Sequence, residues 1–225
     1  QGCSDAGCQF TTTMQGAFKR YEARMTAGLS KSDPYTPGDL LAVGVCVDSA
    51  SEELGQSTDE SYTLQVGADG SGTLEGKTIY GTLRGMETLA QLASFIRPGR
   101  ISNLPIHIED KPAFQYRGLM VNPAGQFMPV SFLKRVVDGL VLNKMNVLHV
   151  HWSDVTSFPI ASEKFLQLAE KGKMGRLVRG PLENATVYTK ADIRDLVDYA
   201  RQRGVRIIPE FGTSSFPTCP SLRLD

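Results

Sequence analysis

The chain has 225 residues, of which 41% are hydrophobic and 21% are charged, a composition typical of a soluble globular protein with one or two domains. The 24 basic residues balance 24 acidic ones, so electrostatics gives no reason to expect binding to nucleic acid or to an anionic membrane. No apolar run approaches the roughly 20 residues that a membrane-spanning helix needs.

The first half, to about Pro112, predicts an α+β domain. Its first element is a helix, because three large apolar residues recur at helical spacing, namely Phe18, Tyr21 and Met25. Residues 40–47 form an apolar run that predicts a strand. Residues 61–66, SYTLQV, alternate as a half-buried strand does.

Glycines then predict a turn after residue 66, at Gly67, Gly70 and Gly72. A second helix is expected over 82–95, with one apolar face made of Leu83, Met86, Leu89, Ala90 and Ala93. Pro98 and Gly99 end this helix. A strand pattern resumes over 101–108 and completes the first half.

The second half predicts a regular strand–helix–strand–helix–strand series. The strands are expected at 117–121, 146–152 and 205–211, and the helices at 129–143 and 188–204. The first of these helices has a buried face of Leu133, Val136, Val137, Leu140 and Val141. This order is that of right-handed parallel βαβ units, as in the first three units of a β/α barrel.

Local signals define the second helix of this series. Thr189 can cap its first turn together with Asp192, three residues later, and Gly204 suits the left-handed residue that ends a helix. The predicted fold is therefore α/β, with a small α+β domain over 1–112 and the first part of a (β/α)8 barrel over 113–225.

Three βα units do not close a barrel, which has eight over about 250 residues. Three parallel strands alone would leave a large apolar surface open. We expect another polypeptide to supply the missing strands, most simply the downstream half of the same precursor after cleavage. The alternative from the residues alone is a small three-stranded doubly wound domain.

The cysteines are Cys3, Cys8, Cys46 and Cys219, and no CxxC motif is present, so zinc or thioredoxin chemistry is not expected. Spacing alone leaves open whether they are thiols or disulfides. Asn184 begins an N-glycosylation sequon, Asn-Ala-Thr. Because the chain starts at Gln1 rather than Met, we expect that an amino-terminal segment has been removed.

Longer motifs run collinearly through both halves. They are ESYTL at 60–64, GTLRGMET at 81–88, YRG at 116–118, NKMNVLH at 143–149, SFP at 157–159, the helix over 188–201, and PEF at 209–211. Together they resemble the family 20 glycoside hydrolases, the β-N-acetylhexosaminidases, and among these the lysosomal animal-type enzymes. The first two motifs resemble the small non-catalytic domain of this family, and the others the first part of its barrel.

The resemblance implies a substrate-assisted reaction, in which the acetamido oxygen of the substrate attacks the anomeric carbon and no cofactor or metal is needed. An Asp-Glu pair after barrel strand four orients that group and protonates the leaving oxygen. Its GGDE-like motif is absent here, and the only Asp-Glu dipeptide, Asp59-Glu60, precedes a strand of the small domain. No catalytic residue is therefore expected in this chain.

The sugar-binding positions after strand one also differ from the family. In the family, the position of Gly125 is held by an arginine that binds the sugar hydroxyls. Glycine has no side chain that could replace this contact. The acid and the histidine on either side fall at Asn122 and Gln126. Losing a charge-assisted arginine contact weakens ligand binding strongly.

Two further loops depart from the pattern. After strand three, the acid and the histidine of Asp-Thr-Pro-Gly-His are replaced by Gly212 and Phe216. After strand two, the first acid of an Asp-Asp pair remains as Asp154, but the second is Val155. The resemblance thus implies a degenerate sugar pocket.

Some polar residues survive as pocket candidates, namely Asp154, His151 and Glu210. His149 and His151 should share one strand face, where structural hydrogen bonding is favoured over metal binding. Glu210 could act as an acid or base, or Arg206 or another partner could neutralise it. Trp152 is expected to pack rather than to stack on sugar.

The resemblance also implies a disulfide between Cys8 and Cys46, and a second between Cys219 and a cysteine of the completing polypeptide, with Cys3 left odd. Such bonds imply an oxidising lumen, lysosome-like or extracellular. Homo- or hetero-oligomers are possible, and no nucleic acid or membrane partner is expected.

Three functional hypotheses follow. The first is a catalytically inactive hexosaminidase-like subunit with a structural or glycan-binding role. The second is the amino-terminal chain of an active, processed β-hexosaminidase whose second chain carries the Asp-Glu pair. The third, a lectin-like module that binds glycans without cleaving them, grades into the first.

Overall fold

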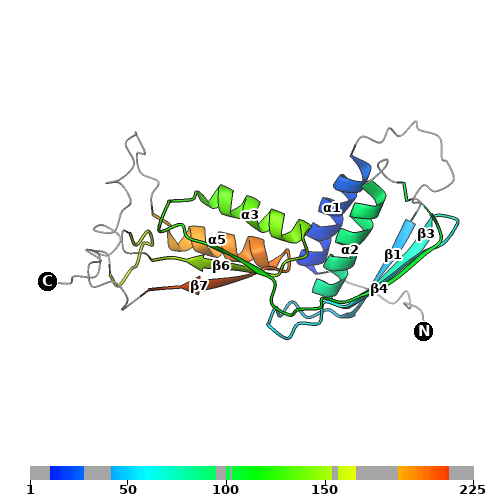
Figure 1. The fold of residues 1–225 in the computed structure, drawn as a ribbon, viewed down its shortest axis with the longest axis horizontal. Coiled ribbons are helices and arrows are strands. Elements are labelled where there is room, and N and C mark those ends of the chain that lie inside the picture. Colours follow the sequence, from blue (N-terminus) through cyan, green and yellow to red (C-terminus); the bar gives the residue numbers. More distant parts are fainter. Residues whose placement is uncertain are drawn as a thin grey trace. The chain divides into compact units, whose positions relative to one another are not determined.

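The computed structural model describes residues 11–27, 42–94, 100–101, 103–153, 157–165 and 187–212. The chain divides into two compact units, Gln1–Gln115 with Gln202–Gly204, and Tyr116–Arg201 with Val205–Asp225. Among the described residues each unit has one sheet and two helices, and Figure 1 shows how these elements are arranged within each unit. Within the described ranges, no helix is both long and apolar enough to cross a bilayer.

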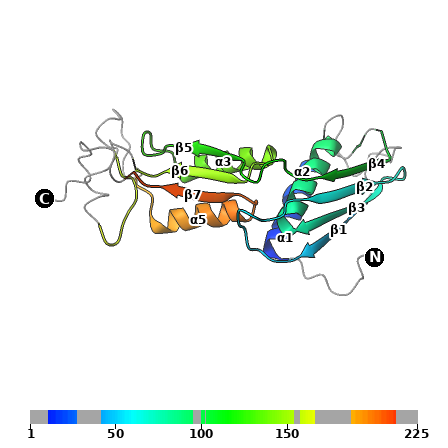
Figure 2. The ribbon, with the colours of Figure 1, turned by 60° about the horizontal axis from the view of Figure 1, so that its bottom comes forward.

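The first unit has a four-stranded mixed sheet in the order β1-β3-β2-β4. Its strands are β1 (Ala42–Ser49), β2 (Tyr62–Val66), β3 (Ser71–Thr78) and β4 (Ile106–Asp110). β1 runs parallel to β3, and β2 is antiparallel to both of its neighbours. The helices α1 (Thr12–Thr26) and α2 (Ile79–Ser94) cover one face of this sheet (Figure 2).

The interior of this unit follows the predicted helical face. All five residues expected on the apolar side of α2 are buried, from Leu83 to Ala93. They pack with Leu64 and Leu74 of the sheet and with Met14 and Tyr21 of α1 in one continuous core. The α+β prediction for the first half is therefore confirmed.

Strand β3 was missed by the sequence analysis, which placed Gly72 in a turn. Gly67 and Gly70 do form the turn, since the Gly67 amide donates to the Ser71 carbonyl at 2.8 Å, but Gly72 lies inside the strand. A Cβ at Gly72 would lie 2.3 Å from the carbonyl oxygen of Gln65, so glycine is needed there for close approach between strands. The strand predicted over 101–108 begins only at Ile106, directly after Pro105, which has no N–H for a strand ladder.

A buried ion pair links the sheet side of this unit to α2. Arg84 donates through Nε and Nη2 to Glu60 Oε1 at 3.1 and 2.7 Å, and the two side chains are 2% and 4% exposed. Arg84 Nη2 also donates to the carbonyl of Gly204, which belongs to the same unit, at 2.8 Å. Since breaking a buried pair leaves an uncompensated charge, Glu60 is held in a structural role.

The second unit is a three-stranded parallel sheet in the order β5-β6-β7. In chain order its elements are β5 (Gly118–Val121), α3 (Val130–Leu142), β6 (Val147–His151), α5 (Lys190–Arg201) and β7 (Arg206–Glu210). This is the predicted strand–helix series, with each element slightly shorter than expected. The α/β prediction of a partial barrel is confirmed, and the described strands form no closed barrel.

Both helices of the second unit lie on the same face of its sheet (Figure 2). Leu133 and Val137 of α3 share one core with Leu196 of α5 and with Leu148 and Val150 of β6. A doubly wound domain would place helices on both faces. The one-sided arrangement therefore agrees with a barrel segment and not with the doubly wound alternative.

Asn146 joins the amino ends of all three strands. Its side-chain Oδ1 accepts a hydrogen bond from the Arg117 amide at 3.0 Å, and its own amide donates to the Arg117 carbonyl at 2.9 Å. The Arg206 amide donates to the Asn146 carbonyl at 2.9 Å. These bonds hold β5, β6 and β7 in register at the end opposite to the loops that follow the strands.

The predicted capping of α5 is confirmed. The Thr189 amide donates to Asp192 Oδ2 at 2.8 Å, and the Asp192 amide donates to Thr189 Oγ1 at 3.1 Å, which is a reciprocal capping box. The hydrogen bonds from the side chain and backbone of Thr189 lower the pKa of Asp192. Gly204 has φ +71°, the predicted left-handed residue after the helix.

The capping box predicts a pH-dependent stability. Because the pKa of Asp192 is lower in the folded state, its contribution is complete above the unfolded value of about 3.9 and is lost as pH falls through the folded value. We expect Asp192→Asn to destabilise the protein by about 1 kcal/mol at pH 6, and by much less at pH 2.5. Urea unfolding at the two pH values measures this. Asp198→Asn, an exposed carboxylate in the same helix, is the control and should show no such difference.

Candidate functional site

The carboxyl end of the parallel sheet brings two histidines and a carboxylate together. His149 and His151 lie on one face of β6, as predicted, and Glu210 ends the neighbouring strand β7. His149 Nε2 lies 2.7 Å from Glu210 Oε2, and His151 Nε2 lies 3.8 Å from Glu210 Oε1. The Glu210 side chain is 45% exposed, so this carboxylate is open to solvent while both imidazoles are partly covered.

The partner of Glu210 is therefore histidine rather than Arg206, the other neutralising group that the sequence suggested. Arg206 precedes Glu210 by four residues in the same strand, which separates their backbones by about 13 Å. Imidazole and carboxylate groups at hydrogen-bonding distance can orient a polar ligand or transfer a proton. Within the described residues, no group of three or more His, Cys, Asp or Glu side chains is arranged to hold a metal ion.

The loop after β5 is a tight turn with its central position open to solvent. The Gly125 amide donates to Asn122 Oδ1 at 2.7 Å, and Gly125 and Gln126 are exposed. A hydrogen bond from the loop after β6 also holds this turn, because the buried Ser157 hydroxyl donates to the Ala124 carbonyl at 2.6 Å. A side chain at position 125 would project from a firmly held backbone, but glycine supplies none.

The loop after β7 leaves similar room. The Gly212 amide donates to the buried Ser153 Oγ at 2.7 Å, which ties this loop to the one after β6. An added Cβ at Gly212 would lie 3.7 Å from His151 Nε2 and 3.7 Å from Ser153 Oγ, both ordinary contact distances. A longer side chain at this position would therefore start beside His151.

Trp152 packs inside the unit, as predicted. Its side chain is 2% exposed and meets the Tyr188 ring edge-on, with centroids 4.9 Å apart. The Tyr188 hydroxyl donates to the Met128 carbonyl, and the Met128 amide donates back to that hydroxyl at 3.3 Å. Burial raises the pKa of Tyr188 well above its usual range, so the hydroxyl stays protonated and able to donate.

Ser153, Ser157 and Tyr188 support the loops around the site, and the sequence analysis assigned this role to none of them, although Ser157 and Tyr188 lie within the family motifs. Their only local signal was polar or aromatic character next to a strand end or a helix cap, which many surface residues share. Several predicted residues lie outside the described ranges, namely Asp154, Val155, Asn184, Phe216, Cys3, Cys8 and Cys219. Cys46 is described and lies on β1.

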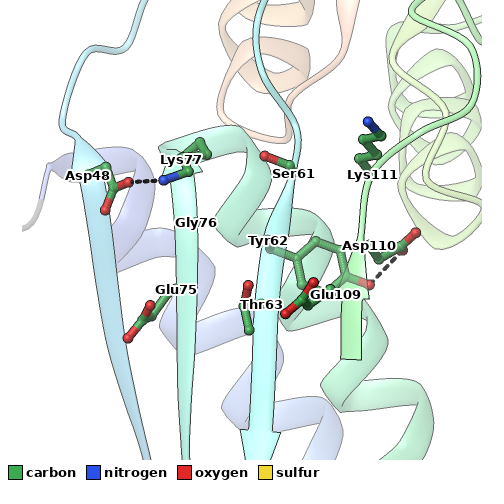
Figure 3. Close-up of a pocket in the computed structure, with 10 residues that line it drawn as sticks. All are labelled: Asp48, Ser61, Tyr62, Thr63, Glu75, Gly76, Lys77, Glu109, Asp110 and Lys111. Carbon is green, nitrogen blue, oxygen red and sulfur yellow. Dashed lines mark hydrogen bonds and ion pairs between the residues drawn. The ribbon is translucent and has the colours of Figure 1, made fainter. Parts of the chain in front are cut away.

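In the first unit, a hollow of about 400 Å³ lies on the face of the sheet opposite to the helices (Figure 3). Polar contacts join two pairs of side chains in its lining. Lys77 Nζ contacts Asp48 at 2.8 Å, and the Tyr62 hydroxyl donates to Asp110 at 2.8 Å. The rest of the lining includes the carboxylates of Glu75 and Glu109 and the ammonium group of Lys111.

Comparison with known families agrees with both units. Residues 114–216 match the catalytic domain of glycosyl hydrolase family 20. Residues 6–92 match the family described as beta-acetyl hexosaminidase like. The two matches follow one another in the chain in the order of the two units.

Curated relatives include beta-hexosaminidase 1 of Arabidopsis thaliana, which is 35% identical over 181 residues, 76% of this chain and 32% of the relative. Beta-hexosaminidase subunit beta of Homo sapiens is 32% identical over 209 residues, 90% of this chain and 36% of the relative. The chain thus spans about a third of the length of these curated relatives.

Solved structures show the same fold. A Flavobacterium johnsoniae chitobiase superposes with a TM-score of 0.70 at 29% identity, covering 88% of this chain and 29% of the chitobiase. The Streptomyces plicatus N-acetyl-β-hexosaminidase, solved with Thio-NAglucal, gives a TM-score of 0.69 at 24% identity, covering 88% of this chain and 39% of that protein. At this lower identity the second likeness concerns the fold alone.

The role of Tyr188 gives a prediction about the stability of the site loops. Tyr188→Phe keeps the ring packing but removes the hydroxyl that bonds both backbone groups of Met128. We expect a loss of about 1–3 kcal/mol in the free energy of unfolding and faster amide exchange at Met128. Urea unfolding and hydrogen exchange measure these effects. Tyr116→Phe, on a side chain that is 49% exposed, is the matched control, and equal losses in both variants would contradict the assigned role.

Proposed function

Because the chain belongs to glycosyl hydrolase family 20, we propose that it is the amino-terminal portion of a β-hexosaminidase-like protein whose sugar pocket has lost its chemistry. In this proposal the chain does not catalyse hydrolysis and acts as a structural or glycan-binding subunit. The framework of the barrel strands is kept, while the side chains that would contact sugar are replaced.

The turn after β5 is the observation that carries this proposal. The resemblance places a sugar-gripping arginine at position 125, where this chain has an exposed glycine. The neighbouring Asn122 uses its side-chain oxygen to hold the turn itself, through the Gly125 amide. A turn that satisfies its own polar groups and has no side chain at its centre offers little to bind sugar hydroxyls.

The environment of Glu60 supports the absence of catalytic residues in this chain. The only Asp-Glu dipeptide, Asp59-Glu60, has its glutamate buried in the ion pair with Arg84. Hydrogen bonds from the side chain and backbone of Ser61 lower the pKa of Asp59. Neither carboxyl group is suited to protonate a leaving group, since one is tied to a guanidinium and the other favours its ionised form.

The assembly and its surroundings are part of the proposal. A second polypeptide, most simply the downstream half of the same precursor, completes the barrel. Disulfides join Cys8 to Cys46 and Cys219 to that polypeptide, and Asn184 carries a glycan. These features suit the lumen of the secretory pathway, a lysosome-like organelle or the extracellular space.

The surviving constellation of His149, His151 and Glu210 favours a second candidate. A solvent-open carboxylate, 2.7 Å from the His149 imidazole and 3.8 Å from that of His151, lies at the strand ends where barrel enzymes carry their chemistry. In this alternative the chain belongs to an active, processed β-hexosaminidase. The second polypeptide then supplies the Asp-Glu pair for substrate-assisted removal of terminal N-acetylhexosamine.

An activity assay separates the two candidates. We expect the complete protein, with its barrel-completing polypeptide, to release no chromophore from a chromogenic N-acetylglucosaminide. Turnover that disappears when the acid of an Asp-Glu pair in that polypeptide is replaced would establish the active alternative. Binding of a glycan without cleavage would instead specify the inactive candidate as a glycan-binding subunit.

Restoring the lost side chains gives a second test. Among the described glycines, those with positive φ are Gly70 and Gly204, so neither Gly125 nor Gly212 is in a conformation that excludes a side chain. We expect Gly125→Arg with Gly212→Asp to strengthen binding of N-acetylglucosamine by about tenfold or more, since charge-assisted hydrogen bonds contribute about 1.5–3 kcal/mol. Isothermal titration of the complete protein measures this.

The control for the added arginine is Gly139→Arg, which adds the same positive charge as Gly125→Arg alone but places it on α3, where a Cβ would meet nothing within 4 Å. An equal gain in this control would show that the effect is non-specific. If the double variant binds N-acetylglucosamine no more tightly than the wild type, the replacements at positions 125 and 212 do not account for the proposed loss of sugar binding.

A further inference from the structure

Arg206 has a buried guanidinium edge without a hydrogen-bond partner in the structure. Its Nε and Nη2 atoms are both inaccessible to solvent, and among the residues that the structure describes neither has a hydrogen-bond partner. The backbone of Arg206 is satisfied, because its amide donates to the Asn146 carbonyl at 2.9 Å. The missing hydrogen bonds are therefore those of the Arg206 side chain and not of its backbone amide.

Arg206 lies on the face of the sheet that carries no helix. The next residue in β7, Ile207, packs against the core beneath the helices. Since side chains alternate along a strand, Arg206 points to the opposite face, together with Ile208 and Glu210. In a closed barrel this is the interior face.

Among the described residues, no hydrogen bond or ion pair joins the Arg206 side chain to an acidic group. Glu210 contacts the histidines at the other end of β7, about 13 Å away. The amino ends of β5 and β6 are preceded by Arg117 and Lys144, which are also cationic. A guanidinium remains protonated at any physiological pH, so the Arg206 side chain keeps its positive charge although it is buried.

The two unpaired atoms also identify the partner. Nε and Nη2 form one edge of the planar guanidinium, and this edge donates two parallel hydrogen bonds to the two oxygens of a carboxylate. A carbonyl or a water molecule would satisfy one atom but not the net charge. The chemistry thus selects an aspartate or glutamate.

We propose that Arg206 binds a carboxylate of the polypeptide that completes the barrel, an Asp or Glu at the amino end of one of its strands. This inference rests on the proposed completion of the barrel and adds its anchoring contact. β7 is an edge of the described sheet, and the chain spans only about a third of its curated relatives, so the next strand would lie beside Arg206.

The test uses the complete protein and compares Arg206→Met with Arg194→Met. Arg194 is exposed on α5 and controls for the loss of one positive charge. We expect Arg206→Met to raise the unfolding equilibrium constant in urea by about thirtyfold or more, and Arg194→Met to leave it nearly unchanged. Arg206→Lys, which keeps the charge but not the paired donors, should lie between wild type and Arg206→Met.

The partner is then found by replacing each Asp with Asn and each Glu with Gln at the amino ends of the completing strands. One such replacement, combined with Arg206→Met, should give a double variant more stable than Arg206→Met alone. This comparison holds even where Arg206→Met folds poorly. Strictly additive effects at every acid, or an Arg206→Met protein as stable as wild type, would overturn the proposal.

These outcomes are separate from those of the activity assay. Hydrolysis of a hexosaminide would refute the inactive reading of the pocket while leaving the coupling between Arg206 and its acid intact. Conversely, loss of coupling with no hydrolysis would refute the anchoring contact alone.

Discussion

A parallel sheet needs cover on both of its faces, and among the described elements the β5-β6-β7 sheet has helices on only one. Most features of the second unit follow from that constraint. Side chains facing α3 and α5 form a closed apolar core, whereas the other face carries Arg206 at one end and the histidines with Glu210 at the other. The exposed side chain of Met120 on β5, which is paired in register with His149, belongs to the same face.

The two ends of this sheet have different chemical characters. At the amino ends, Asn146 and backbone hydrogen bonds hold the strands in register, and the architecture of the family is retained. At the carboxyl ends, Ser153 and Ser157 still fix the loops, but glycine occupies positions 125 and 212. In the proposed function, the scaffold of the site is preserved more fully than the groups that would bind sugar, so fold and activity are argued separately.

Local signals in the sequence were sufficient for much of the fold. The Thr189–Asp192 box, the left-handed Gly204 and the apolar faces of α2 and α3 depend on residues only a few positions apart. β3 was missed because its glycines serve close packing: a Cβ at Gly76 would lie 2.2 Å from Thr82 Oγ1, a contact with no local signature. In the site, alternation placed His149 and His151 on one face, but pairing of His149 with Glu210 depends on strand register. The link from Ser153 to Gly212 spans 59 residues, and spacing carries no information about it.

The open edges of β5 and β7 also bear on the order of events during biosynthesis. Unpaired strand edges are templates for pairing with any other extended chain, including a second copy of the same molecule. If the proposed processing takes place, it has to follow folding, because earlier cleavage would leave the edges and one face of the β5-β6-β7 sheet exposed. The cut would then fall in a surface loop of a completed barrel, and the two parts would stay together because each lacks strands that the other supplies.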